Sequence, residues 1–171
     1  MSDFTFDEIR SLGDAHKNYQ YKLVIAPLPG TGDVDERILS MRNVSCSLPA
    51  TGVQVVSYDL AGFTMREAGL TKQTHDFTAT FIESSNVGVR KRLDSWLNLC
   101  NERLTNVQLP KSTYQTTCEV RLHDGQKRTQ FVGKFYGFFI TDLGQLQLQN
   151  NGNSASQVQA TFSYDLWVPA N

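Results

Sequence analysis

The residue types that most often carry catalysis or bind metals are scattered along this chain. Its three histidines, His16, His75 and His123, lie far apart, and none is two to five residues from a cysteine or another histidine, the spacing typical of metal ligands. The three cysteines form no Cys-x-x-Cys pair, and their odd number argues against a disulfide framework. We therefore expect ordinary histidines and reduced cysteines. Cys46 keeps a second interpretation open, a cross-link at a subunit boundary.

Three further patterns resemble parts of known sites without completing one. The acidic cluster at 33–36 lacks the alternating oxygen ligands, central glycine and distal glutamate of an EF-hand. Gly30 and Gly32 are not followed by the Gly-Lys-Ser/Thr of a phosphate-binding loop. No serine lies in a Gly-x-Ser-x-Gly motif. The sequence therefore predicts no enzyme, no metal site and no cofactor.

The charge balance argues against a surface that binds nucleic acid. Lysine and arginine total 16 against 17 acidic residues, so no basic surplus is available to form such a face. The aromatic run at 135–139 could stack on bases, but without basic residues around it we interpret it as packing in a core or between copies. The chain opens without a signal-peptide pattern and has no stretch of about 20 apolar residues, so we expect a soluble protein with no membrane contact.

Two helices are expected among the elements that hold these residues. Phe6, Ile9 and Leu12 recur at a spacing of three and precede Gly13, which predicts a short N-terminal helix at about 4–13. A stronger apolar stripe that includes Val89 and Trp96 predicts a helix at about 85–101, lying on a sheet with its other side in solvent. Ser84, Ser85 or Asn86 are the expected caps of this second helix.

The rest of the chain is dominated by strand patterns. Strands are expected at 19–26, 38–47, 53–58, 74–82, 114–122, 129–140, 145–149 and 157–168. The Asp124-Gly pair predicts a hairpin turn, and residues 60–73 are expected to form a long loop or hairpin outside the core. Because no βαβ alternation is present, we expect a mainly β, antiparallel sandwich or barrel over about 19–168, within a single domain spanning 1–171.

Alternation within two strands separates a core face from a polar face. In 74–82, Phe77, Ala79 and Phe81 point one way, and threonine and aspartate point the other. The same alternation continues in the closing strand. The polar candidates are Thr74, Asp76, Thr78, Thr80, Thr161, Ser163 and Asp165.

Taken together, these segments resemble the tail tube proteins of contractile-tailed bacteriophages, which are related to the inner tube of type VI secretion systems. The resemblance covers about 20–167 and depends on the order and spacing of its parts. These are Val44-Ser-Cys-Ser-Leu-Pro-Ala-Thr-Gly52, Gly62-Phe-Thr-Met-Arg66, the helix with Arg92, Leu93 and Trp96, Tyr136-Gly137 leading to Asp142-Leu-Gly144, and Phe162-Ser-Tyr-Asp-Leu-Trp167.

The resemblance implies a structural subunit of a virion tail, made in the host cytoplasm. Its partners would be further copies, in stacked hexameric rings, together with sheath, baseplate and tail terminator proteins. DNA would pass through without specific binding, along a lumen lined by the polar candidates. The segment 60–73 would contact neighbouring subunits. Its candidates are Leu60, Gly62, Phe63, Met65, Arg66 and Gly69.

Two alternatives remain open from the sequence. One is the inner tube of a related contractile injection machine, either type VI secretion or a bacteriocin. The other is a monomeric β-barrel that binds a small ligand in an apolar cavity.

Overall fold

The computed structural model describes residues 17–27, 36–124, 126–146 and 155–170. The predicted helix at 4–13 lies outside these residues. The elements are β1 (Tyr21–Ile25), α2 (Glu36–Arg42), β2 (Asn43–Cys46), β3 (Thr51–Leu60), β4 (Phe63–Gln73), β5 (Asp76–Ile82), α3 (Gly88–Cys100), α4 (Lys111–Tyr114), β6 (Thr116–His123), β7 (Thr129–Leu143), β8 (Gln157–Ser163) and β9 (Leu166–Ala170).

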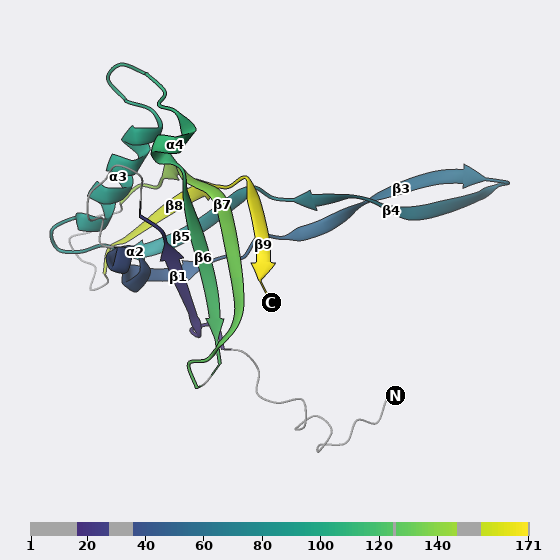
Figure 1. Cartoon of the computed structure of the whole chain (residues 1–171), viewed down its shortest axis with the longest axis horizontal. Helices are drawn as coiled ribbons and strands as arrows, with labels where there is room; N and C mark the ends of the chain where they lie inside the picture. Colours follow the sequence, from purple (N-terminus) through teal and green to yellow (C-terminus); the bar gives the residue numbers. More distant parts are fainter. Residues whose placement is uncertain (1–16, 28–35, 125, 147–154, 171) are drawn as a thin grey trace.

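The strands form a body and a separate arm (Figure 1). In the body every pairing is antiparallel, in the order β1-β6-β7-β8-β5-β2, with β9 also paired to β7. The arm is the two-stranded hairpin β3–β4, which extends away from the body. This architecture confirms the prediction of a mainly β, antiparallel fold with a flanking helix.

The long strand β7 belongs to both halves of the body. Its first part lies between β6 and β9, whereas its last part, residues 139–143, pairs with β8. The change of partner coincides with a bulge, because Cys118 and Thr116 of β6 pair with Phe135 and Phe138. Gly137 sits in this bulge with φ +64°, a conformation that L side chains rarely adopt. The extra residue lets Phe135 and Phe138 both point into the core.

An aromatic cluster fills the interior of the body under α3. Phe77, Phe135, Phe138 and Phe162 are at most 1% exposed, and their ring centroids lie 4.7 to 6.3 Å apart in the pairs that touch. Trp96 of α3 packs on this cluster, and its indole N–H donates to the carbonyl of Tyr114 at 2.8 Å. The predicted apolar stripe of the helix is therefore confirmed, and large side chains occupy the space in which a ligand-binding barrel would need a cavity.

The N-terminus of α3 is capped mainly by a residue that the sequence analysis did not consider. Glu83 accepts hydrogen bonds from the backbone N–H groups of Val89 (3.0 Å) and Arg90 (2.9 Å). Ser84 Oγ, one of the predicted caps, accepts from the N–H of Gly88 at 2.9 Å. A carboxylate satisfies free N–H groups and also interacts favourably with the helix dipole.

Three strand predictions need correction. Residues 36–42 form α2 and not the start of a strand, because Glu, Leu, Met and Arg favour helix and Leu39 packs into the core. Gln145 and Leu146 are not in a strand, and β8 pairs with the end of β7 instead. The predicted closing strand is two strands, β8 and β9, which separate at Tyr164 and Asp165. The remainder of 145–149 lies outside the described residues.

Candidate functional site: a polar sheet face and an apolar hairpin

The first candidate surface is the side of the sheet that faces away from the core. In β5 and β8, Phe77 pairs with Phe162 and Ala79 with Ala160, and all four are buried. Their neighbours therefore point outward. We call this surface the polar face. Its residues are Ser45, Asp76, Thr78, Thr80, Asp142, Gln159, Thr161 and Ser163. The same side of the sheet carries Phe139 beside Ser163, and the Ile82–Gln157 pair at its other end.

Register brings five of the seven predicted polar candidates together on this face. Asp76 lies opposite Ser163, Thr78 lies opposite Thr161, and Thr80 lies on the same side one step further along. Ser45, Asp142 and Gln159 complete the face and were not among the candidates. Gln159 could have been found by extending the alternation from Thr161.

Asp142 was missed because the predicted strand ended at residue 140, and a bulge in β7 also shifts the register just beyond that point. Ile140 pairs with Phe162 but Asp142 pairs with Thr161, which leaves Thr141 as the extra residue. The Thr141 hydroxyl donates to the carbonyl of Thr161 at 3.1 Å. Such a shift changes which face a side chain occupies, and alternation alone does not reveal it.

The other two candidates, Thr74 and Asp165, lie outside the strands. Thr74 precedes β5, and its carbonyl accepts the hydroxyl of Tyr164. Desolvation at this buried position raises the pKa of Tyr164. Asp165 lies in the turn after β8, where Gln115 Nε2 donates to its carboxylate at 3.3 Å and Lys111 Nζ lies 3.8 Å away. Asp165 therefore faces α4 and β7.

The eight residues of the polar face carry two carboxylates and no lysine, arginine or histidine. Hydroxyl and amide groups make up the rest. Such a surface interacts well with water and offers no cation to a phosphate backbone.

The second candidate surface lies on the β3–β4 hairpin. The predicted loop at 60–73 is a strand, so of the two predicted forms, loop or hairpin, the hairpin is confirmed. Ala61 and Gly62 both have positive φ, +50° and +82°, as in the type I′ turn that joins two strands directly. Every residue of β3 is exposed, and in β4 only Gly69 and Gln73 are not fully exposed.

The two faces of the hairpin differ in chemistry. Leu60 pairs with Phe63, and Tyr58 pairs with Met65, so these residues share one side with Val56. We call this side the apolar hairpin face; the exposed fractions of its five side chains range from 41% to 73%. Glu67, the partner of Val56, borders them on the same side and accepts the Tyr58 hydroxyl at 2.6 Å. The opposite side is polar near the tip, where the Thr64 hydroxyl donates to Asp59 Oδ1 at 2.7 Å, and it becomes apolar at the Val55–Ala68 pair.

The predicted contact residues lie at different places on the hairpin: on its two sides, in its turn and beside its bulge. Leu60, Phe63 and Met65 lie on the apolar hairpin face, and Gly62 is in the turn. Arg66 lies on the polar side. Gly69 lies beside a bulge, where a Cβ would approach Val56 Cγ2 to 2.8 Å.

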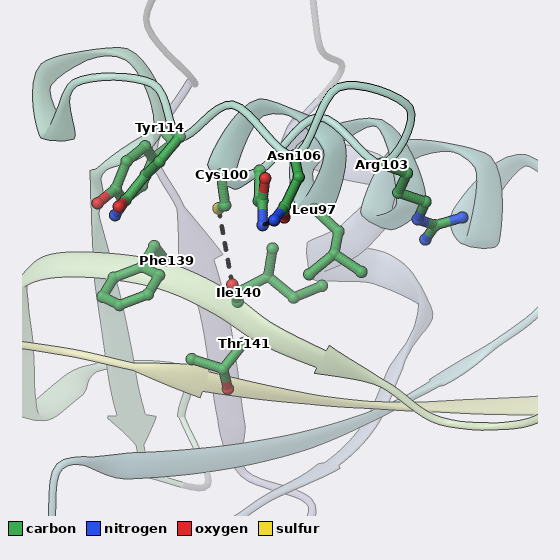
Figure 2. Close-up of a pocket in the computed structure, with 10 residues that line it drawn as sticks. Leu97, Cys100, Arg103, Asn106, Tyr114, Phe139, Ile140 and Thr141 are labelled. Atoms are coloured by element: carbon green, nitrogen blue, oxygen red, sulfur yellow. Dashed lines mark hydrogen bonds between the residues drawn. The ribbon is translucent and has the colours of Figure 1, made fainter.

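A pocket of about 790 Å³ lies between the end of α3 and β7 (Figure 2). Cys100, the one thiol in its lining, donates to the carbonyl of Ile140 at 3.7 Å. Burial raises the pKa of Cys100 to about 11, so the group is a neutral thiol near neutral pH and a poor nucleophile. Arg103 at the rim is paired with Asp94. The lining therefore offers a concave surface without an evident catalytic pair.

The other cysteines are equally unsuited to nucleophilic chemistry. Burial raises the pKa of Cys46 to about 11 and that of Cys118 well above its ordinary value. All three are free thiols. Across the described ranges no group of three or more His, Cys, Asp or Glu side chains is arranged to hold a metal ion. In the same part of the chain no helix is long and apolar enough to cross a membrane.

The sequence model of the family described as phage tail tube protein matches residues 15–170. The chain belongs to the phage tail tube protein family. This confirms the resemblance seen in the sequence and makes the chain a tail tube structural protein. A search of curated proteins gave no significant match.

Solved structures give the same fold at low sequence identity. The sheath/tube terminator of an extracellular contractile injection system, PVC, has a TM-score of 0.65 and 13% identity, over 94% of this tail tube protein and 99% of that chain. The anti-feeding prophage tube terminating cap has a TM-score of 0.65 and 11% identity, over 93% of both chains. Hcp1 from Flavobacterium johnsoniae has a TM-score of 0.50 and 11% identity, over 88% and 94%.

Proposed function

We propose that this tail tube protein forms hexameric rings that stack into a hollow conduit through which DNA passes during ejection. The observation that carries the proposal is the separation of a polar sheet face from an uncovered apolar hairpin face on the same subunit. A lumen needs the first surface and an assembly contact needs the second. The subunit has no catalytic role in this proposal.

Ring closure is supported by the two edges of the sheet that carries the polar face. At one edge β2 pairs only with β5, and at the other edge residues 139–143 pair only with β8, among the strands that the structure describes. Unpaired strand edges are a liability in a monomer, whereas neighbouring copies can complete their hydrogen bonds. Two different edges that meet give a heterologous contact, and such a contact closes into a ring when the rotation between neighbouring copies completes a full turn.

The polar face then lines the lumen. Asp76 and Asp142 make the wall mildly acidic, and the threonine, serine and glutamine side chains keep it hydrated. DNA that passes such a wall is weakly repelled and finds no phosphate contacts. Thr74 and Asp165 remain lumen candidates only at the rim, because they lie beyond the ends of β5 and β8.

The apolar hairpin face binds a neighbouring copy in this assembly. An isolated two-stranded hairpin is at best marginally stable in water, and exposed apolar faces of this kind mark interaction sites. Leu60, Phe63 and Met65 are the anchors, and Gly62 shapes the tip. Sheath, baseplate and terminator proteins are the further partners of the stacked rings in a virion tail, and the subunit is made in the host cytoplasm.

The fold match to parts of extracellular contractile injection systems favours a second candidate, the inner tube of such a machine. The ring and the role of each surface would be the same, and the cargo would differ. Encapsulated DNA in tubes isolated from particles would favour the phage tail, and tubes filled with protein would favour the injection system.

Electron microscopy of the purified full chain tests the proposal. Hexameric rings or hollow tubes are the expected result. A chain that stays monomeric at high concentration and takes up a hydrophobic dye would overturn the proposal and favour the ligand-binding barrel.

A further inference from the structure

A basic groove lies where the described part of the chain begins. It has a volume of about 950 Å³ and lies between the start of β1, the end of α2 and the β6–β7 turn. Its lining includes Lys17, Lys22 and Lys127, with Asp124 as the carboxylate among them. The Asp124 carboxylate already accepts hydrogen bonds from the backbone N–H groups of Gln126 and Arg128. The lysines therefore dominate the field in the groove.

The same groove presents apolar surface without a cover. Tyr19 is 73% exposed and Met41 is 82% exposed, and both line the groove. Lys17 Nζ lies 6.0 Å from the centroid of the Tyr19 ring, so cation and aromatic surface are adjacent. An occupant that fits this surface carries both carboxylates and apolar side chains. The groove shares no residue with the polar face or with the apolar hairpin face.

We propose that residues 1–16 of the same chain dock in this groove. This segment contains Asp3, Asp7, Glu8 and Asp14 against one arginine, so it complements the lysines of the groove. Its apolar residues Phe6, Ile9 and Leu12 recur at the spacing of one side of the predicted helix. The sequence of this segment thus supplies both features that the groove requires.

The proposed occupant is joined directly to the groove by the chain. Lys17, the first described residue, is itself part of the lining. The predicted helix ends at Gly13, and the three residues that follow span at most about 10 Å when fully extended. A ten-residue helix is about 15 Å long. Because the segment is tethered, docking is intramolecular and is favoured by a high effective concentration.

Hydrogen exchange of the full chain tests this docking. Backbone amides at 6–12 should exchange about tenfold more slowly in the wild type than in the double variant Lys22→Glu/Lys127→Glu, because exchange then requires undocking. Adding Asp7→Lys/Glu8→Lys to that variant should restore the protection, since the charges are complementary again. The matched control Lys91→Glu reverses a charge on the solvent side of α3 and should leave the protection unchanged. Unchanged protection in β6 shows that the variants fold.

Equal exchange of 6–12 in the wild type and the groove variant would overturn the proposal. A photo-cross-linking residue in place of Phe4, in a mixture of equal amounts of light and heavy isotope-labelled chains, separates docking within a chain from docking between chains. Cross-links from that site to peptides of β1 or the β6–β7 turn in chains of the same isotope are expected. Cross-links between light and heavy chains would overturn the assignment to the same chain.

Discussion

Gly137 lies against Asp165 at the point where β7 leaves one set of partners and joins β8. A Cβ built on Gly137 would lie 2.6 Å from Asp165 Cγ and 3.0 Å from Asp165 Cβ. The N–H of Asp165 donates to the carbonyl of Tyr136 at 2.9 Å, which ties the β8–β9 turn to the bulge. The absence of a side chain at Gly137 therefore permits two changes of direction, one in β7 and one between β8 and β9.

Gly137→Ala should destabilise the subunit by about 1–3 kcal/mol, because the new methyl group meets Asp165 and the residue keeps a positive φ. Urea unfolding followed by tryptophan fluorescence measures the change. Gly52→Ala is the matched control, since no atom lies within 4 Å of its Cβ position. The control should stay within about 0.5 kcal/mol of the wild type. Equal stability of the two variants would contradict the proposed role of Gly137.

Removing the carboxylate at the start of α3 should also lower stability. Glu83→Ala leaves the N–H groups of Val89 and Arg90 without their partner and should cost about 1–2 kcal/mol. Glu83→Gln keeps an acceptor without the charge and should cost less. Glu102→Ala, at an exposed loop carboxylate, is the control and should have little effect. If Glu83→Ala has the same urea midpoint of unfolding as the wild type, Glu83 is not the effective cap.

The buried thiols should make stability fall at alkaline pH. Cys46 and Cys100 have pKa values raised to about 11 by burial, whereas an unfolded thiol has a pKa of about 8.5. Between these values the unfolded chain loses protons that the folded chain retains, so the free energy of unfolding decreases as pH rises. Urea midpoints measured from about pH 8 to about pH 10.5 should therefore fall. In Cys46→Ala/Cys100→Ala the decline should be shallower, and an equally steep decline would contradict this origin.

Prediction from the sequence worked best for segments in which a single strand or helix periodicity separates buried from exposed side chains along the whole segment. Phe77, Ala79 and Phe81 alternate with polar residues in a strand with one buried face, and Trp96 lies on the apolar stripe of α3. In both cases the apolar residues of the pattern are the ones buried in the core of the subunit. Five polar candidates were found together on one face because they alternate with the buried residues of β5 and β8.

The errors arise where tertiary structure changes the local pattern. Two bulges each add a residue to β7: the one at Gly137 brings Phe138 into the core, and the one at Thr141 moves Asp142 onto the polar face. The segment 36–42 combines Ile and Leu in an order that suits either a strand or a helix, and the packing of Leu39 decides for helix. The hairpin was recognised only as one of two possibilities, because its exposed strands lack a buried face within the subunit.

The apolar hairpin face should be required for assembly but not for folding. Leu60→Ser/Phe63→Ser removes two exposed apolar side chains. Burial of each side chain in a contact would stabilise the assembly by about 1.5–3 kcal/mol. Sedimentation velocity and electron microscopy should show loss of tubes, while the thermal unfolding of the monomer changes little. Asp59→Ser on the polar side of the hairpin is the control and should still assemble. Normal tubes from the double variant would exclude this face from the contacts.

A positive charge on the polar face should make the lumen surface bind DNA, which the wild-type surface does not bind. Asp76→Lys places a cation between threonine and serine side chains on that face, and in a ring the charge would be repeated around the lumen. Assembled tubes of this variant should bind DNA in a salt-dependent manner and slow its passage, whereas Asp76→Asn should not. Asn98→Lys adds the same charge on the exposed side of α3 and tests whether the position matters. Loss of ring formation in Asp76→Lys, with normal rings in Asn98→Lys, would place Asp76 in a subunit joint and not in the lumen.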